Sequence, residues 1–459
     1  MTDPVTDSVP TTPASTTPVS TTPDSNRQSG LLERLFQLSE RQTSVRQEVI
    51  AGLTTFLTMA YIIFVNPNVM AAAGMDQGAV FTATCLAAAV GCLIMGLYAN
   101  YPFALAPGMG LNAFFSYVVV GEMGYSWQVA LGAVFISGVV FLLLSIFRVR
   151  QWVIDSIPMS LRQALAAGVG LFLAIIALKS AGIVTASPAT LVTLGDVTSS
   201  DAVLAALSFV LIAALAYRRV LGAVMIGILA VTAIALVMGK VQFGGVVSAP
   251  PSMAPTFLQL DIAGAFNVGM ISVIFAFLFV DLFDTAGTLL STADRAKLLD
   301  KDGKLPGMGK ALMADSSAST VGSLIGSSTT TTYVESTAGV AAGGRTGLTA
   351  VVCAGLFLLA LFFSPLVGMV PACATAGALM YVAVLMTSGL SSIDWDDITE
   401  AAPAVIAAVM MPLSFSIANG IALGFIAYAL IKTLSGRYKD VSISVYALAA
   451  LFVAKFIFF

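Results

Sequence analysis

The sequence contains no histidine and few charged residues of any kind. Charged side chains make up 10% of the 459 residues. Soluble domains contain about 25%, so this depletion excludes an ordinary soluble protein. Because histidine is absent, any proton-coupled chemistry near neutral pH must use carboxylates instead.

The chain also has few cysteines and no long basic run. The four cysteines all lie inside apolar segments, where they behave as small hydrophobic residues. We therefore expect no disulfide framework, no metal site and no other cofactor. The net charge of −3 argues against a nucleic-acid partner.

Apolar runs of about 20 residues recur along almost the whole chain. About 20 helical residues cross a hydrocarbon core of ~30 Å, so we predict an all-α polytopic membrane protein in a lipid bilayer. The runs and their breakers predict fourteen spans, at residues 48–66, 79–98, 106–120, 128–147, 160–182, 202–217, 219–238, 267–291, 309–326, 335–343, 346–366, 371–389, 401–416 and 417–433. The last run, residues 441–459, either spans the membrane, lies at its interface or packs on the bundle.

The N-terminal region and the loop charges predict how the chain is oriented. Residues 1–30 are rich in Thr, Pro and Ser, which predicts a disordered cytoplasmic tail, and residues 31–47 form an amphipathic lead-in. Only Lys179 and Lys240 fall opposite the main group of loop cations, which predicts a cytoplasmic N-terminus. That group is Arg148, Arg150, Arg162, Arg218, Arg219, Arg295, Lys297, Lys301, Lys304, Lys310, Arg345, Lys432, Arg437 and Lys439.

The two halves of the chain resemble each other weakly. Residues 90–94, near the end of the second span, recur as residues 321–325 near the end of the ninth. An odd number of spans per repeat gives the halves opposite orientations, which is the inverted-repeat design of secondary transporters. We therefore predict two seven-span repeats, at residues 48–238 and 267–433.

Each predicted repeat is interrupted at the same place. Residues 100–112 contain two prolines and two glycines, and residues 327–339 begin with a Ser/Thr run that favours extended backbone. Each segment predicts a short extended piece followed by a half-helix. Such backbone survives at membrane depth only inside protein or beside a water-filled cavity, so the matched interruptions indicate a binding site.

Acidic residues inside the spans are the strongest functional candidates. Asp281 and Asp284 lie near the centre of the eighth span, where a carboxylate costs roughly 2.5 to 3.5 kcal/mol. Their spacing, with Thr288 four residues further on, places all three on one helical face. Glu335 stands where the second half-helix begins. The alternatives are a structural aspartate held by Ser or Thr, and a Glu335 that only caps its helix.

The other interrupted segment supplies complementary groups. Gly110 lets a ligand approach the backbone, and the Asn112 amide offers both a donor and an acceptor. Leu105 and Val334, from the same two segments, complete the predicted substrate-binding set. A planar heterocycle with donors and acceptors on its edges fits these groups, and a proton on Asp284, Glu335 or Asp281 would couple H+ to transport.

These residues give the chain a resemblance to a known family. It resembles the nucleobase-ascorbate (xanthine/uracil permease) superfamily, and within it the AzgA-like branch of adenine/guanine/hypoxanthine permeases. The resemblance covers about residues 40–459 and rests on four stretches: TFLTMAYIIFVNP (55–67), ALAPGMGLNAFF (104–115), FVDLFDTAGTL (279–289) and SSTTTTYVESTAGVAAGGRTGLTA (327–350).

The resemblance implies a fold and a function. The fold is a seven-plus-seven inverted repeat, with a core domain of spans one to four and eight to eleven and a gate domain of the remaining spans. The function is proton-coupled purine uptake across the plasma membrane by alternating access, in a homodimer formed through the gate domains. By position, Asp284 and Glu335 match the family's essential acids, and Gly110 and Asn112 match its third-span motif. Thr288 stands where uracil-type relatives have histidine, which favours the purine branch.

Several other functions compete with purine transport. A sulfate- or bicarbonate-like anion transporter of the same architecture is opposed by the negative charge of Glu335 at a half-helix N-terminus. A uracil or xanthine permease is the nearest alternative within the family. An intramembrane aspartyl hydrolase would need acids from two facing helices, and a channel would not show counter-flow, so we predict a carrier and not an enzyme.

Overall fold

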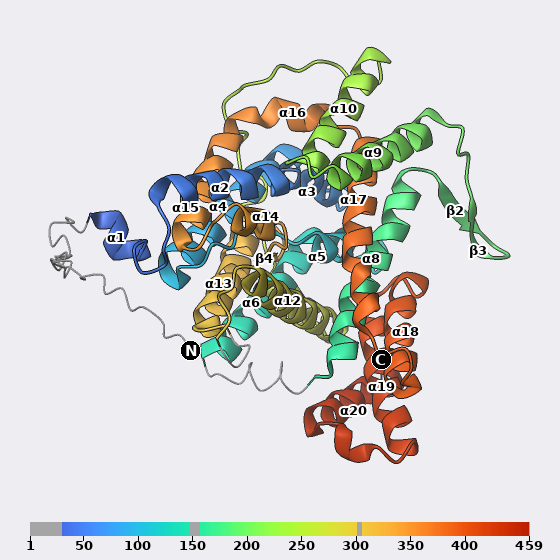
Figure 1. The fold of residues 1–459 in the computed structure, drawn as a ribbon. Coiled ribbons are helices and arrows are strands. Elements are labelled where there is room, and N and C mark those ends of the chain that lie inside the picture. Colours follow the sequence, from blue (N-terminus) through green and yellow to red (C-terminus); the bar gives the residue numbers. More distant parts are fainter. Residues whose placement is uncertain (1–29, 147–156, 301–304, 459) are drawn as a thin grey trace, which may run out of the picture.

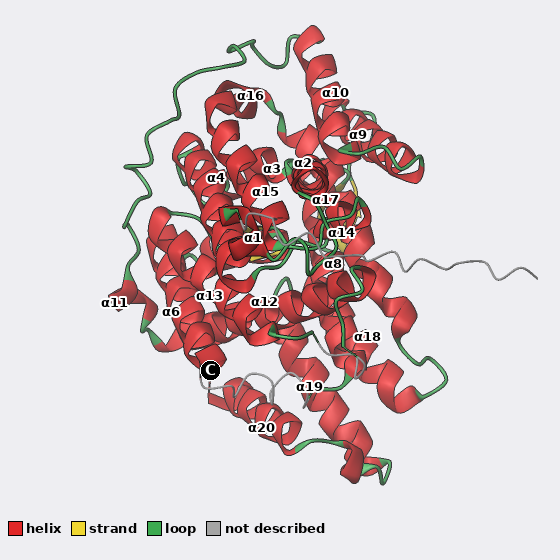
Figure 2. Cartoon of the chain, turned by 60° about the vertical axis from the view of Figure 1, so that its left-hand side comes forward, coloured by secondary structure: helices red, strands yellow, loops and turns green. Residues whose placement is uncertain are grey.

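The computed structural model describes residues 30–146, 157–300 and 305–458. The predicted disorder of residues 1–29 and the loop cations Arg148, Arg150, Lys301 and Lys304 lie outside these ranges. Helices dominate the described chain (Figure 2). Nine of the helices in those ranges are long and apolar enough to cross a membrane, and four shorter apolar helices accompany them.

Each of the fourteen predicted spans contains a helix. The elements of the first half are α1 (Leu31–Phe36), α2 (Val45–Met59), α3 (Ile62–Ala71), α4 (Gln77–Ile94), β1 (Leu105–Pro107), α5 (Met109–Ala113), α6 (Trp127–Ile146), α8 (Met159–Ser180), β2 (Val184–Ser187), β3 (Leu191–Leu194), α9 (Ser200–Tyr217) and α10 (Ala223–Val237). Two π-helical turns, Met95–Ala99 and Phe114–Val120, extend α4 and α5. The hairpin of β2 and β3 was not predicted.

The second half repeats the order of two spans, a short strand and a half-helix. It comprises α11 (Ile262–Ala265), α12 (Val268–Arg295), α13 (Met308–Ile325), β4 (Thr330–Thr332), α14 (Ser336–Ala341), α15 (Gly347–Ala360), α16 (Ser364–Met369), α17 (Ala372–Thr387), α18 (Ile398–Leu413), α19 (Ile417–Leu434) and α20 (Ile443–Phe458). Several helices begin at a side-chain cap. Asp76 accepts from the Ala79 N–H at 2.7 Å, and Asp397 accepts from the Thr399 N–H at 2.9 Å.

The two interrupted segments pair with each other in the middle of the bundle. Strand β1 lies antiparallel to β4, with Leu105 opposite Thr332 and Pro107 opposite Thr330. The Gly108 N–H extends this ladder by donating to the Thr329 carbonyl at 2.8 Å. Each strand leads into a short helix, α5 or α14, so the predicted extended pieces and half-helices are confirmed. Pairing also satisfies backbone groups that lipid could not.

The helices form two packed groups. In the first, which we call the core group, α2, α4, α6, α12, α13 and α15 contact one another; in the second, the gate group, α8 packs on α17, α18 and α19, and α9 packs on α10 and α17. Figure 1 shows α8 and α17 running side by side. The groups meet where α12 contacts α8 and α19 and where α5 contacts α8.

The C-terminal run forms a helix that packs on the bundle. The Thr433 and Tyr446 hydroxyls are 2.7 Å apart near the start of α20, and Lys455 Nζ donates to Asn419 Oδ1 at 3.2 Å near its end. These contacts make α20 antiparallel to α19, and Figure 2 shows the two helices together. Residues 443–458 therefore pack against the last span of the gate group.

The acidic segment around residues 394–400 is exposed at Asp394 and Asp396 but anchored at its end. Glu400 Oε1 lies 2.6 Å from Nζ of Lys432, a side chain that is 3% exposed. Glu400 also accepts from Tyr428 and from Ser160. Hydrogen bonds from Thr399 lower the pKa of Asp397 to about 2, so this carboxylate stays charged at physiological pH. The segment therefore ties α8, α18 and α19 together.

Replacing Glu400 with glutamine should destabilise the gate group. Lys432 would then be buried without its closest counter-charge, and breaking a buried ion pair from one side costs about 3–5 kcal/mol. We expect a clearly lower midpoint in thermal unfolding of the purified protein in detergent. Glu400→Gln combined with Lys432→Met should recover most of the loss, whereas exposed Asp394→Asn serves as the control. An unchanged midpoint in Glu400→Gln would show that the pair adds nothing.

Candidate functional site

Two carboxylates from different helices of the second half meet beside the paired strands. Asp284 lies on α12, which contacts β4, α14, α5 and α8. Glu335 immediately precedes α14, and its side chain makes no capping hydrogen bond to that helix. The two carboxylates are close enough to repel each other electrostatically. The structure thus brings together the two acids that the sequence singles out most strongly.

A tyrosine from the first span holds one of these acids. Tyr61 lies at the junction of α2 and α3, is 1% exposed, and donates its hydroxyl proton to Glu335 Oε1 at 2.7 Å. Thr58 donates to the Glu335 carbonyl at 3.5 Å. Tyr333 donates to the Pro107 carbonyl at 2.6 Å, which links the second broken span to the first. Glu335 is therefore positioned by a side chain 274 residues away, and not by its own helix.

Asp284 faces the boundary between the two helix groups. It lines a small space with apolar side chains from α12 and from the gate helices α8 and α17, namely Val280, Phe283, Leu165, Ala166, Val169 and Met386. This places a half-buried carboxylate against the surface where the two helix groups meet. An anion in such surroundings requires a partner, which a ligand N–H or a proton would supply.

Gly110 allows the closest approach between the groups. A Cβ atom added to Gly110 would lie 2.3 Å from Cγ1 of Val169 on α8. A contact this short cannot be tolerated, so only glycine fits here in the observed arrangement. In the observed arrangement, the space beside Gly110 is taken by Val169 of the gate helix α8.

Asn112 belongs to a buried polar chain inside the core group. Its Nδ2 donates to Asn66 Oδ1 at 2.5 Å, Asn66 donates to Thr84 Oγ1 at 2.7 Å, and Thr84 donates to the Val80 carbonyl at 2.7 Å. Among the described residues, Asn112 Oδ1 has no partner although the side chain is 0% exposed. The amide therefore bonds to α3, and within the described chain it bonds to neither carboxylate.

The remaining predicted residues lie at different depths. Asp281 accepts from Ser319 Oγ at 3.3 Å and so faces α13, whereas Asp284, three residues on, faces the gate helices. Thr288 is half-buried. Leu105 is 0% exposed, and its N–H and C=O bond to Cys92 Sγ, which makes it part of the packing under β1. Val334, next to Glu335, is 45% exposed.

Asp315 is a buried acid that the sequence analysis missed. It lies in α13, is 0% exposed, and accepts from Thr285 at 2.9 Å and from Thr332 at 3.1 Å. These bonds join α12, α13 and β4 around one carboxylate. The signal was available, because Asp315 falls inside a predicted span just as Asp281 does.

Comparison with known proteins decides the family. The model for the xanthine/uracil permease group, described as a permease family, matches residues 46–423. The chain belongs to this permease family. It is a multi-pass membrane transporter and not an enzyme, so the resemblance seen in the sequence is confirmed.

Curated relatives resemble this permease over nearly their whole length. The adenine permease AdeP of Escherichia coli K12 is 54% identical over 94% of this chain and 96% of its own. The guanine/hypoxanthine permease PbuG of Bacillus subtilis 168 is 48% identical over 93% of this chain and 100% of its own.

Solved structures support the fold of the permease. The transmembrane domain of the cyanobacterial bicarbonate transporter BicA superposes with a TM-score of 0.62 at 16% identity, covering 83% of this chain and 97% of that one. SLC26A9 gives a TM-score of 0.62 at 12% identity, covering 88% of this chain and 68% of its own. At these identities the likeness shows the fold alone, and it confirms the predicted seven-plus-seven inverted repeat.

Proposed function

We propose that this permease imports purine nucleobases, namely adenine, guanine or hypoxanthine, by proton symport. The observation that carries the proposal is the meeting of Glu335, held by Tyr61, with Asp284 beside the paired broken spans. The names of relatives about half identical to this chain, which include adenine and guanine/hypoxanthine permeases, support the choice of purines.

The proposed substrate recognition relies on carboxylate oxygens that accept hydrogen bonds. An ionised carboxylate only accepts hydrogen bonds, so Glu335 and Asp284 select a ligand that presents N–H groups. Purine bases carry ring and exocyclic N–H donors along their edges. Thr288 lies four residues from Asp284 in the chain, and Val334 is adjacent to Glu335. Leu105 and Asn112 would support the site indirectly, Leu105 by packing and Asn112 through its hydrogen bond to Asn66. An inorganic anion would instead meet a negatively charged carboxylate.

The proposed coupling of proton and purine transport follows from the electrostatic repulsion between the two carboxylates. Two carboxylates that sit close together in an apolar surrounding cannot easily both be ionised, so one proton is held between them. A proton that enters with the base and leaves with it would couple the two fluxes without histidine. Asp281 and Asp315 lie behind this pair in the core group and make bonds to hydroxyls, so we assign them a supporting role.

The proposed cycle is alternating access in the plasma membrane. The core group would move against the gate group across the Gly110–Val169 contact, with the N-terminus in the cytoplasm. We place the two functional repeats at residues 48–238 and 267–433, and we propose a homodimer that forms through gate groups, as the family resemblance implies.

Uptake measurements test this function directly. Cells that express the protein would be given radiolabelled adenine, guanine, hypoxanthine, uracil or sulfate, with and without a protonophore. We expect purine uptake that the protonophore abolishes, and no sulfate uptake. Transport of sulfate alone would replace the proposal with an anion carrier, and purine uptake that depended on Na+ would refute the proton coupling.

A further inference from the structure

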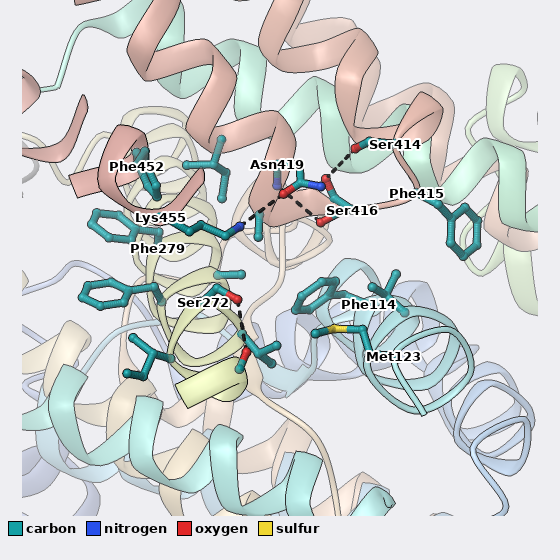
Figure 3. Close-up of a pocket in the computed structure, with 18 of the residues that line it drawn as sticks. Phe114, Met123, Ser272, Phe279, Ser414, Phe415, Ser416, Asn419, Phe452 and Lys455 are labelled. Carbon is teal, nitrogen blue, oxygen red and sulfur yellow. Dashed lines mark hydrogen bonds between the residues drawn. The ribbon is translucent and has the colours of Figure 1, made fainter. Parts of the chain in front are cut away.

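One cavity in the described part of the chain lies away from the proposed purine site. It has a volume of about 530 Å³ and shares no lining residue with the small space beside Asp284. Its walls come from α12, the turn that follows α5, the link between α18 and α19, and α20 (Figure 3). Four phenylalanine side chains labelled there, Phe114, Phe279, Phe415 and Phe452, make much of this wall apolar.

The polar groups of this cavity gather at one end. Lys455 Nζ points into it and donates to Asn419 Oδ1 at 3.2 Å, close to Ser416 and Ser414 (Figure 3). Ser414 and Ser416 belong to the link between α18 and α19, which is where two spans end. The cavity therefore has a polar end beside the link between two predicted spans and an apolar body along α12 and α20.

Lys455 carries a charge that the described chain leaves unbalanced. No carboxylate in those ranges forms an ion pair with it, and its hydrogen-bond partner Asn419 is neutral. Glu122 also lines the cavity, but its side chain is exposed to solvent at the end of the third span. A lysine near the end of a membrane helix normally extends its ammonium toward the headgroups, whereas here the half-buried ammonium turns inward.

We propose that this cavity binds an anionic phospholipid, with its phosphate on Lys455 and an acyl chain along the phenylalanine wall. The distribution of groups matches such a molecule, because one cation and hydroxyl and amide donors stand at the boundary above an apolar channel. The lipid would sit between α12 of the core group and α19 and α20 beside the gate group. This site is separate from the purine site and does not depend on the proposed transport activity.

Native mass spectrometry of the purified full chain tests the site. The probes are phosphatidylglycerol and phosphatidylcholine with the same acyl chains, titrated into the protein in detergent. We expect phosphatidylglycerol to bind at least about tenfold more tightly, since a paired charge in a partly buried site is worth about 1.4 kcal/mol or more. Lys455→Met should remove this preference and Lys455→Arg should keep it.

Two further variants separate the cavity from the charge. Ala276→Phe fills the cavity wall while Lys455 stays in place, and it should lower binding of both lipids. Lys310→Met removes a lysine that lies over the Tyr98 ring, outside the cavity, and should change nothing. Equal binding of phosphatidylglycerol to the wild type and to Lys455→Met would overturn the proposal. Displacement of the lipid by adenine would also overturn it, because the cavity would then belong to the substrate's route.

Discussion

Replacing Glu335 with glutamine is expected to abolish purine uptake while the protein still folds and inserts. Glutamine keeps the size of the side chain but removes the charge that receives both the ligand and the Tyr61 hydroxyl. Loss of a buried charged hydrogen bond costs about 2–5 kcal/mol, so initial uptake rates should fall at least about 30-fold. Radiolabelled purine uptake, normalised to the amount of protein in the membrane, measures this.

Tyr61→Phe is the matched control for this variant. It leaves the carboxylate in place and removes only the hydroxyl that positions it, at 2.7 Å. We expect an intermediate loss of about tenfold, which corresponds to roughly 1.5 kcal/mol for a hydrogen bond to a charged group. If Glu335→Gln transports normally, Glu335 does not belong to the site. If Tyr61→Phe is as inactive as Glu335→Gln, the tyrosine itself contacts the ligand.

Gly110→Ala is expected to reduce uptake because the added methyl group would push the two helix groups apart. The added Cβ would meet Val169 Cγ1 at 2.3 Å, but it would lie 3.7 Å from Val169 Cβ, which is an ordinary contact. Overpacking of this kind costs about 1–3 kcal/mol, so uptake should fall by at least about fivefold. Gly110→Ala combined with Val169→Ala should therefore recover much of the activity, since Val169→Ala removes the clashing Cγ1 together with Cγ2 and leaves Cβ at an ordinary contact distance.

The controls for Gly110→Ala distinguish a local clash from a general effect. Gly355 on α15 has no atom within 4 Å of an added Cβ, so Gly355→Ala should transport normally. Val169→Ala alone should retain most of the activity. If the double variant remains as inactive as Gly110→Ala, then the backbone freedom of Gly110 or a direct ligand contact, and not the fit against α8, explains the requirement for glycine.

Local patterns in the sequence predict much of this fold. Apolar runs identify the helices because a membrane-spanning helix must be long enough and apolar enough to cross the hydrocarbon core. The matched interruptions at residues 100–112 and 327–339 are visible because Pro, Gly and a Ser/Thr run cannot form an ordinary span. Asp284 and Glu335 can be singled out as site candidates in the sequence because placing a carboxylate in lipid is energetically costly.

Contacts between distant segments could not be predicted in this way. The hydrogen bond from Tyr61 to Glu335 joins residues 274 apart, and nothing in the local pattern marks Tyr61 as its donor. Asp281 and Asp284 share a helix, yet one meets Ser319 and the other meets the gate helices, because the packing of α13 and α8 decides which side each faces. The ion pair of Glu400 with Lys432 likewise depends on how α18 packs on α19.

The ladder between β1 and β4 restricts how the proposed binding site can vary. Leu105 is opposite Thr332, so the segments that carry Gly110 and Glu335 are held in one register. A single inserted residue in either strand would turn its side chains to the opposite face. Exchanging only one of the two segments with a relative would risk a mismatched ladder. Chimaeras that aim to alter substrate choice should therefore exchange residues 100–112 and 327–339 together, so that both strands of the ladder come from the same protein.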